Sequence, residues 1–223
     1  METIAHNVAN AGTVGYRAEE IRFETLLARA GDKKVAFTSP GESFVQTNSG
    51  AMVKTGNPLD VAVAGDGWLG LQSPQGIIYT RDGRMVMAES GNLQSVNGYG
   101  VLDAGGAALL LDATAGPPTI SRDGMITQSG RQVGAVGLFK LEPNSKLTRT
   151  DNSGVQSDKP ASPVLDFTSS GVIQGFTEAA NVNPVMEMTR MMNIQRTFDG
   201  IASAMDASES TYVDAIKTLG ASA

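Results

Sequence analysis

Cysteine is absent from this chain of 223 residues, and histidine occurs once, as His6. Without cysteine, disulfides, thiolate zinc sites, iron–sulfur clusters and thiol catalysis are excluded. A Ser-His-Asp triad or a histidine metal site would depend on His6 alone, which lies close to the start of the chain. We therefore predict that the protein is not an enzyme, with no catalytic residues, no cofactor and no metal.

Charged residues and long apolar runs are also scarce. Only 18% of residues are charged, against about 25% in a typical globular domain, and no apolar run approaches the ~18 residues that a membrane span needs. The net charge of −6 repels phosphate. We therefore expect no nucleic-acid binding and no membrane insertion. The start of the chain also lacks the basic region and apolar block of a cleavable secretory signal.

Glycine, in contrast, is plentiful, with 26 residues that are unevenly distributed. Glycines recur every few residues between Gly31 and Gly175, whereas Gly200 is alone between Asn181 and Leu219. This distribution predicts a middle region rich in turns and a C-terminal region compatible with a helix.

The C-terminal region carries an apolar repeat of period 3.5. Asn183-Pro184 suits the start of a helix and Gly220 suits its end, which predicts one helix from about Pro184 to Leu219. We call its apolar stripe the seam, formed by Met191, Ile194, Phe198, Ile201, Met205, Tyr212 and Leu219. Ser208 and Ala215 occupy the two remaining positions of the repeat.

The N-terminus has a short stripe with the same spacing, formed by Met1, Ile4, Val8 and Ala11. We therefore expect an α+β fold in which long terminal helices pair as a coiled-coil-like helical domain, with a mainly antiparallel β domain inserted between them. Ile4 and Val8 would then share an assembly interface with the seam. The alternative is that each stripe packs on the β domain.

The middle region has the alternation and turns of antiparallel strands. Three turn sequences predict hairpins, at Asp82-Gly83, Asn97-Gly98 and Asp123-Gly124, whereas Glu142 to Pro163 reads as a loop. The predicted organisation is an N-terminal helix and turn (1–23), an extended connector (24–55), a β domain (56–174) and a C-terminal helix (175–223).

Two patterns in the β region could carry chemistry. The run Gly65-Asp66-Gly67-Trp68-Leu69-Gly70 spells G-x-G-x-x-G after a predicted strand, but a dinucleotide site needs a helix next, and the following residues read as a strand. We interpret the run as a tight turn with Trp68 in the core. Asp82 and Asp123 lie in turns that their side chains stabilise. A hydrolase built on such carboxylates is therefore a weaker alternative.

Four blocks of the sequence resemble the signatures of flagellar rod and hook proteins, in the same order. They run from Ile4 to Arg17 (A-N-x-x-T-x-G-Y/F-[KR]), from Thr55 to Leu69 (T-G-N-P-L-D-x-A-[IV]-x-G-D-G-[FW]), from Tyr79 to Gly83 (Y-T-R-x-G) and from Gly175 to Met188 (G-x-x-E-x-S-N-V-x-x-V-x-E-M). The residues taken to carry the match are Asn7, Ala9, Asn10, Thr13, Gly15, Tyr16, Asn57, Pro58, Leu59, Asp60, Gly65, Asp66, Gly67, Trp68, Asn181 and Val182.

The resemblance implies a structural subunit of the bacterial flagellar basal-body rod that polymerises through its terminal helices. Trp68-Leu69 resembles the proximal rod protein more than the distal one, which usually has Phe-Phe there. The implied partners are copies of itself, neighbouring rod subunits and the type III export apparatus, and the implied location is the periplasmic rod, reached without a cleavable signal. The family also implies a longer N-terminal helix, with residues before Met1. The second alternative is a β-domain binding module with a coiled-coil oligomerisation tail.

Overall fold

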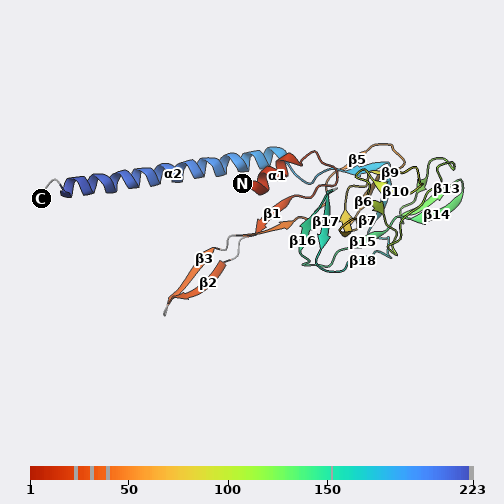
Figure 1. Cartoon of the computed structure of the whole chain (residues 1–223), viewed down its shortest axis with the longest axis horizontal. Helices are drawn as coiled ribbons and strands as arrows, with labels where there is room; N and C mark the ends of the chain where they lie inside the picture. Colours follow the sequence, from red (N-terminus) through yellow and green to blue (C-terminus); the bar gives the residue numbers. More distant parts are fainter. Residues whose placement is uncertain (23–24, 31–32, 39–40, 152, 221–223) are drawn as a thin grey trace.

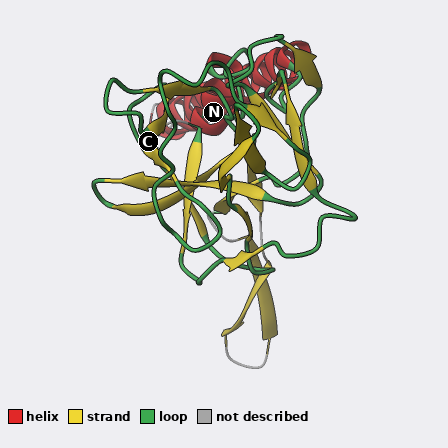
Figure 2. Cartoon of the chain, turned by 90° about the vertical axis from the view of Figure 1, so that its right-hand side faces the viewer, coloured by secondary structure: helices red, strands yellow, loops and turns green. Residues whose placement is uncertain are grey.

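The computed structural model describes residues 1–22, 25–30, 33–38, 41–151 and 153–220. A β body lies at one end of an elongated molecule, and the long helix α2 (Pro184–Gly220) extends away from it (Figure 1). The short helix α1 (Glu2–Ala9) lies beside the start of α2. A hairpin of β2 (Thr25–Ala30) and β3 (Lys33–Thr38) projects from the body, as Figure 2 also shows.

The remaining described residues are mostly short strands joined by turns. In chain order the other strands are β1 (Glu19–Arg22), β4 (Glu42–Val45), β5 (Met52–Lys54), β6 (Val61–Ala64), β7 (Trp68–Ser73), β8 (Gly76–Thr80), β9 (Met85–Met87), β10 (Leu93–Ser95), β11 (Gly100–Val101), β12 (Thr119–Ile120), β13 (Met125–Gln128), β14 (Arg131–Ala135), β15 (Leu138–Lys140), β16 (Leu147–Arg149), β17 (Gly154–Ser157), β18 (Ser162–Pro163), β19 (Gly171–Gln174) and β20 (Phe176–Glu178).

Strand β7 is the centre of the largest sheet in the described part of the chain. It pairs antiparallel with β8, β11 and β15, and the sheet runs in the order β16-β17-β8-β7-β11-β10-β9 with β15 and β18 off this path. The strands β12, β13 and β14 form a separate antiparallel sheet, and β19 pairs with β6. All of these pairings are antiparallel, as the turn-rich middle region predicts.

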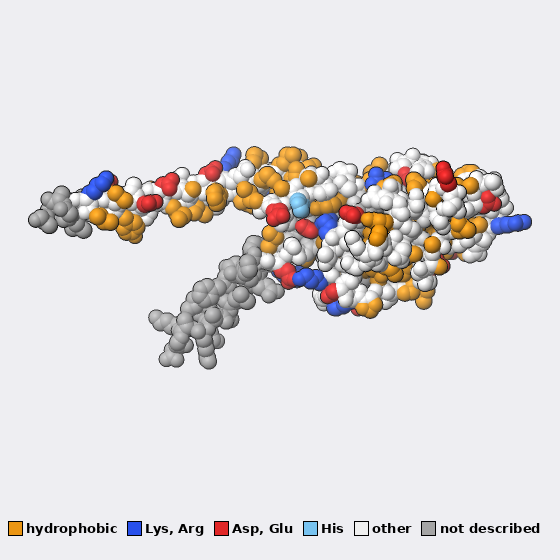
Figure 3. Space-filling model, in the orientation of Figure 1, with side chains coloured by type: hydrophobic (Ala, Val, Ile, Leu, Met, Phe, Trp, Pro, Cys, Tyr) orange, Lys and Arg blue, Asp and Glu red, His pale blue; other side chains and the backbone are white. Residues whose placement is uncertain are grey.

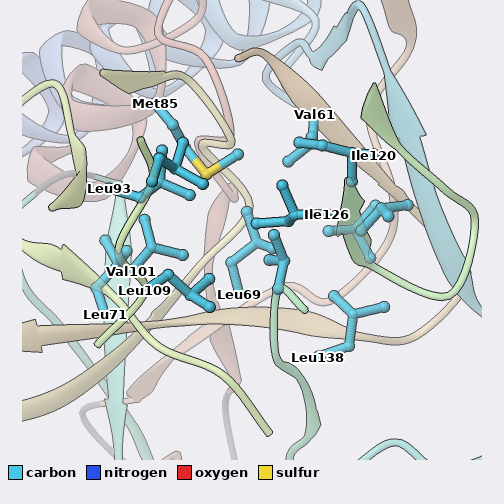
Figure 4. Close-up of a cluster of buried hydrophobic side chains, with 14 of the residues drawn as sticks. Val61, Leu69, Leu71, Met85, Leu93, Val101, Leu109, Ile120, Ile126 and Leu138 are labelled. Carbon is cyan, nitrogen blue, oxygen red and sulfur yellow. The ribbon is translucent and has the colours of Figure 1, made fainter. Parts of the chain in front are cut away.

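The main core of the body joins these sheets (Figure 4). Val61 and Val63 of β6, Leu69 and Leu71 of β7 and Ile126 of β13 are all at most 1% exposed. Because β6 and β7 bury both of their faces, their sequences are nearly continuous apolar runs. Trp68 is 3% exposed and packs with Val45 and Val155 in a second cluster, which confirms its prediction as a core residue.

Two of the three predicted hairpins are confirmed. Asn97-Gly98 joins β10 to β11 and Asp123-Gly124 joins β12 to β13, with both glycines at positive φ. The hairpin predicted at Asp82-Gly83 is wrong, because β8 pairs with β7 and β17 while β9 pairs with β10. A Cβ on Gly83 would lie 1.8 Å from the Val61 carbonyl oxygen. Glycine is therefore needed here because the backbone of Val61 packs closely against it, and not because of a hairpin turn.

The loop predicted from Glu142 to Pro163 is also wrong, because it contains β16, β17 and β18. Strands β16 and β17 pair with each other, and β17 then pairs with β8 of the central sheet. The segment is rich in Ser, Asn and Pro, which favours loops, but pairing with strands elsewhere in the fold makes these residues form strands.

The predicted pair of long terminal helices is wrong, and the described chain is mainly β with two helices. Helix α1 has eight residues and α2 has 37, or about 12 Å against about 55 Å at 1.5 Å per residue. A turn follows α1 at Asn10, and Gly15 at φ +69° lies beyond it. Because α1 is so short, it contacts only the beginning of α2, and most of α2 is exposed.

The single helix predicted from about Pro184 is confirmed by α2. Asn183 caps it, since its Oδ1 accepts hydrogen bonds from the backbone N–H groups of Val185 (3.1 Å) and Met186 (3.2 Å). Pro184 then occupies the first helical position, where its missing N–H costs nothing.

Candidate assembly surface and the junction at its base

A buried carboxylate, Glu178 at the end of β20, connects the segment after α1 with the segment before α2. Its Oε1 accepts hydrogen bonds from Arg17 Nη2 and from the Gly50 backbone N–H, both at 2.7 Å, and its Oε2 accepts one from Arg81 Nη1 at 3.2 Å. Arg17 and Arg81 are at most 1% exposed. Glu178 therefore ties together segments that lie far apart in the sequence.

Trp68 lies against both guanidinium groups. The Cζ atoms of Arg17 and Arg81 are 5.8 Å and 5.2 Å from the centroid of its ring, within range of a cation–π interaction. Burial lowers the pKa of Arg81 to about 10, against the opposing attraction of Glu178. Glu178 forms an ion pair with each of the two buried guanidinium groups. The stability of this cluster therefore depends on the charge of Glu178.

Asn7 fixes α1 to the body. Its Nδ2 donates to the Glu19 carbonyl oxygen at 2.8 Å, and its Oδ1 accepts from the Glu19 N–H at 2.9 Å and from the Tyr16 hydroxyl at 3.2 Å. The Arg149 guanidinium lies 4.3 Å from the centroid of the Tyr16 ring and donates to the Arg17 carbonyl oxygen. Burial raises the pKa of Tyr16, and Arg149 opposes the shift.

Asn181 makes the corresponding contacts just before α2. Its Oδ1 accepts from the Ala18 N–H at 2.6 Å, and its Nδ2 donates to the Asn48 carbonyl oxygen at 2.9 Å. The Gly15 N–H donates to the Glu178 carbonyl oxygen at 2.7 Å. We call this group the junction, and it consists of Asn7, Gly15, Tyr16, Arg17, Trp68, Arg81, Glu178 and Asn181.

A second group of signature residues shapes the body beside the junction. Asn57 Oδ1 accepts from the Leu59 N–H at 3.1 Å, and Asn57 Nδ2 donates to Asp60 Oδ1 at 3.0 Å. The Asp60 carbonyl oxygen accepts from the Gly175 N–H at 2.8 Å. This turn therefore holds the start of β6 against the segment that leads to β20.

The other signature residues lie in turns or at the surface. Thr13 Oγ1 donates to Asn10 Oδ1 at 3.2 Å in the turn after α1. Gly65 has φ +79° and opens the turn between β6 and β7, so the G-x-G-x-x-G run is followed by a strand and not by a helix. Asp66, Pro58 and Ala9 are exposed, Val182 is half-buried and Gly67 is buried.

Sequence reasoning missed the charged members of the junction as functional residues. Arg17, Arg81 and Glu178 each lie inside a block that resembles the family; Arg17 and Glu178 have no charged residue directly beside them in the sequence, whereas Arg81 is followed by Asp82. Charged residues in such surroundings are a signal for burial in an ion pair, but the sequence does not indicate which of them meet.

The seam of α2 lies on the surface. Phe198 and Met205 are each 68% exposed and Tyr212 is 70% exposed; Ile194 and Ile201 are also exposed, and Met191 is half-buried. Ile4 and Val8 of α1 are half-buried. The Leu219 side chain lies outside the described residues. Figure 3 shows apolar side chains along α2, with acidic and basic side chains at intervals between them.

A groove of about 770 Å³ runs between β4 and the segment 140–147. Its rim carries the ion pair of Glu42 and Lys146. A hydrogen bond from Lys146 lowers the pKa of Glu42, and Glu42 raises the pKa of Lys146. Both groups are exposed and charged at neutral pH, so this pair does not supply the protonated acid and free base that hydrolysis needs.

The apolar face of α2 is thus exposed over much of the helix, and exposed apolar surfaces of this kind often mark sites of interaction in proteins. Within the described residues, no helix is long and apolar enough to span a bilayer.

Comparison with known proteins identifies the family. The model of the flagellar hook protein FlgE/F/G D1 domain matches residues 62–128, and that of the flagellar basal body rod FlgEFG protein C-terminal region matches residues 173–217. The flagellar basal-body rod protein FlgF of Mesorhizobium japonicum is 44% identical over 99% of this chain and 91% of the relative; FlgF of Rhizobium meliloti is 41% identical over 100% and 92%. FlgG of Bacillus subtilis is 29% identical over 94% and 89%. The chain belongs to the flagellar basal-body rod protein family, and these two FlgF proteins are more similar to it than this FlgG protein.

Proposed function

We propose that the chain is a structural subunit of the bacterial flagellar basal-body rod, in its proximal part, and serves flagellum-dependent motility. The exposed seam of α2 is the observation that supports this function best, because a lone monomer would leave it in water. The names of the relatives point to a rod subunit and not to the hydrolase or the binding module considered above.

The assembly interface consists of α1 and α2 residues. Burial of apolar side chains contributes about 25 cal/mol per Å² removed from water, so a stripe of large residues can stabilise a subunit contact. The proposed residues are Ile4, Val8, Met191, Ile194, Phe198, Ile201, Met205, Tyr212 and Leu219. The junction would hold this interface in a fixed direction relative to the β body.

The proposed partners are copies of this chain, neighbouring rod subunits and, during secretion, the flagellar export apparatus. The proposed location is the periplasmic rod. The lack of cysteine is compatible with a chain that crosses a narrow channel unfolded and then meets an oxidising compartment, because no incorrect disulfide can form there.

Phe198→Glu tests the proposal at the centre of the seam. A carboxylate in a buried apolar contact lacks a partner, so we expect subunit association to weaken by about 100-fold or more and rods to be absent from cells. Sedimentation of the purified chain and motility of cells are the measurements. Ser203→Glu adds the same charge on the opposite side of α2 and serves as the matched control.

Circular dichroism and thermal melting should show that the β body of both variants remains folded, since Phe198 is exposed on α2 and belongs to neither core cluster. If cells with Phe198→Glu build rods and swim like cells with Ser203→Glu, the seam is not the assembly surface.

A further inference from the structure

We propose that Asn97 is a site of spontaneous modification, where the side-chain amide is lost as ammonia, and that the hairpin between β10 and β11 controls the rate of this loss. Asn97-Gly98 is the only Asn-Gly pair in the sequence, and both residues are exposed. Asparagine is one of the chemically labile residues. The site belongs to the β body and not to the assembly surface, so it is independent of the proposed function.

The reaction needs only the chain itself and water. The backbone nitrogen of Gly98 attacks Cγ of Asn97, and the new C–N bond closes a cyclic imide. The bond between Cγ and Nδ2 breaks, and the amide nitrogen leaves as ammonia with the proton of the Gly98 N–H. Water then adds to one of the two ring carbonyl carbons. Opening at Cγ leaves aspartate at position 97, and opening at the main-chain carbonyl leaves isoaspartate.

The glycine after Asn97 makes this attack easier than at other exposed asparagines. Gly98 has no Cβ to crowd its nitrogen or to restrict its backbone angles. Asn48 and Asn144 are also exposed, but serine follows each of them. We therefore expect Asn97 to react faster than either of these two residues.

The folded hairpin restrains the attacking nitrogen. The Gly98 N–H donates to the Ser95 carbonyl oxygen at 2.9 Å, and the Ser95 N–H donates to the Tyr99 carbonyl oxygen at 2.8 Å. The Ser95 Oγ also accepts from the Tyr99 N–H at 3.2 Å. Because the Gly98 nitrogen has to give up its proton and turn towards Cγ, this turn has to open before the ring can close.

The hydrogen bonds of the turn set the size of this protection. A single net hydrogen bond changes an opening equilibrium by about fivefold. Since several are lost when the turn opens, we expect Asn97 to react at least about tenfold more slowly in the folded protein than in the unfolded chain.

Isoaspartate at position 97 should also weaken the body. It adds one carbon to the main chain between positions 97 and 98, so the hydrogen bonds that close the turn can no longer all form. Strands β10 and β11 carry Leu93 and Val101, which are at most 1% exposed and belong to the main core. Aspartate keeps the normal main chain, so its effect on stability should be smaller.

Peptide mass spectrometry of the full-length chain tests the site and the protection. The protein is incubated at mildly alkaline pH, folded in one sample and in urea in the other, and the loss of amide is followed at each asparagine. We expect Asn97 to react faster than Asn48 and Asn144 in both samples, and at least about tenfold more slowly when folded. Faster reaction at Asn48 or Asn144 in the folded protein would overturn the assignment of the site. Equal rates at Asn97 in the two samples would overturn control by the hairpin.

Two serine variants separate opening of the turn from unfolding of the whole body. Ser95→Ala removes one hydrogen bond of the turn and should speed the reaction of folded Asn97 by about fivefold, without effect in urea. Ser73→Ala is the matched control, because Ser73 is also buried and its Oγ donates to the Gly76 carbonyl oxygen at 2.8 Å in the hairpin between β7 and β8. The rate at Asn97 should be unchanged in this control. Equal acceleration in both variants would mean that global unfolding exposes Asn97, and control by its own hairpin would be wrong.

Urea unfolding tests the consequence of the modification. The fraction of aged protein that contains isoaspartate should unfold at lower urea than Asn97→Asp, which carries the same charge on a normal main chain. Equal midpoints would show that the turn accommodates the added carbon, and the predicted weakening of the body would be wrong.

Discussion

At the scale of single residues, the junction depends on Glu178, which lies between two buried guanidinium groups. Glu178→Gln keeps the shape of the side chain but leaves Arg17 and Arg81 without a counter-charge. We expect the free energy of unfolding to fall by about 3–5 kcal/mol, as for other buried ion pairs that lose one member. Urea unfolding followed by circular dichroism measures the change.

Glu42→Gln is the control for this prediction, because Glu42 also binds a basic group, Lys146, but at the surface. The midpoint of unfolding of this variant should equal that of the natural chain. If the two variants have the same midpoint, the buried junction does not hold the terminal segments to the body.

Two tyrosines are expected to make the stability of the protein depend on pH in the alkaline range. Burial raises the pKa of both Tyr16 and Tyr79. A folded-state pKa above the unfolded value of about 10 contributes stability below pH ~10, which is lost as pH rises through the folded pKa. We therefore expect unfolding free energy to fall above pH ~10.

Absorbance of tyrosinate measured against pH should show a late component that is missing from the Tyr16→Phe/Tyr79→Phe double variant. Identical titration curves for the natural chain and this variant would contradict the raised pKa values.

At the scale of secondary-structure elements, Gly15 sets how closely the segment after α1 approaches the body. Its φ is +69°, and a Cβ there would lie 2.2 Å from the Asp82 backbone nitrogen. Gly56 has φ +76° with no atom within 4 Å of such a Cβ. Gly56→Ala should therefore cost about 1 kcal/mol of unfolding free energy from the backbone alone, and Gly15→Ala about 3 kcal/mol or more.

Chemical denaturation of the two alanine variants separates these contributions. Equal losses would mean that the segment can move away from Asp82 without cost, and that the two signature blocks are not held in close contact.

Local signals in the sequence predicted some elements well. The seam and the Asn183-Pro184 start predicted α2 because both act within a few turns of one helix. The hairpins at Asn97-Gly98 and Asp123-Gly124 were predictable for the same reason. Asp82-Gly83 has the same composition, but the strands on either side find partners elsewhere, and no local signal indicates this.

At the scale of the whole molecule, the length of α1 and the contacts of the junction are two features that could not be predicted from the sequence alone. The shared spacing of Ile4, Val8 and the seam suggested two long paired helices, but α1 ends after Ala9. Arg17 and Glu178 were recognised within signature blocks, yet their contact joins residues 161 positions apart. The division into segments 1–23, 24–55, 56–174 and 175–223 stays a prediction.

That separation determines when the chain can finish folding. When the N-terminal part of a chain becomes available for folding first, Arg17 is present early. Its ion pair cannot form until Glu178, in the last quarter of the sequence, is also present. Closure of so long a loop is slow compared with local hairpin formation. The β hairpins can therefore form first, while the N-terminal segment remains undocked until nearly all of the chain has emerged. As a result, α1 and α2 can reach their fixed orientation only when nearly the whole subunit is available for folding.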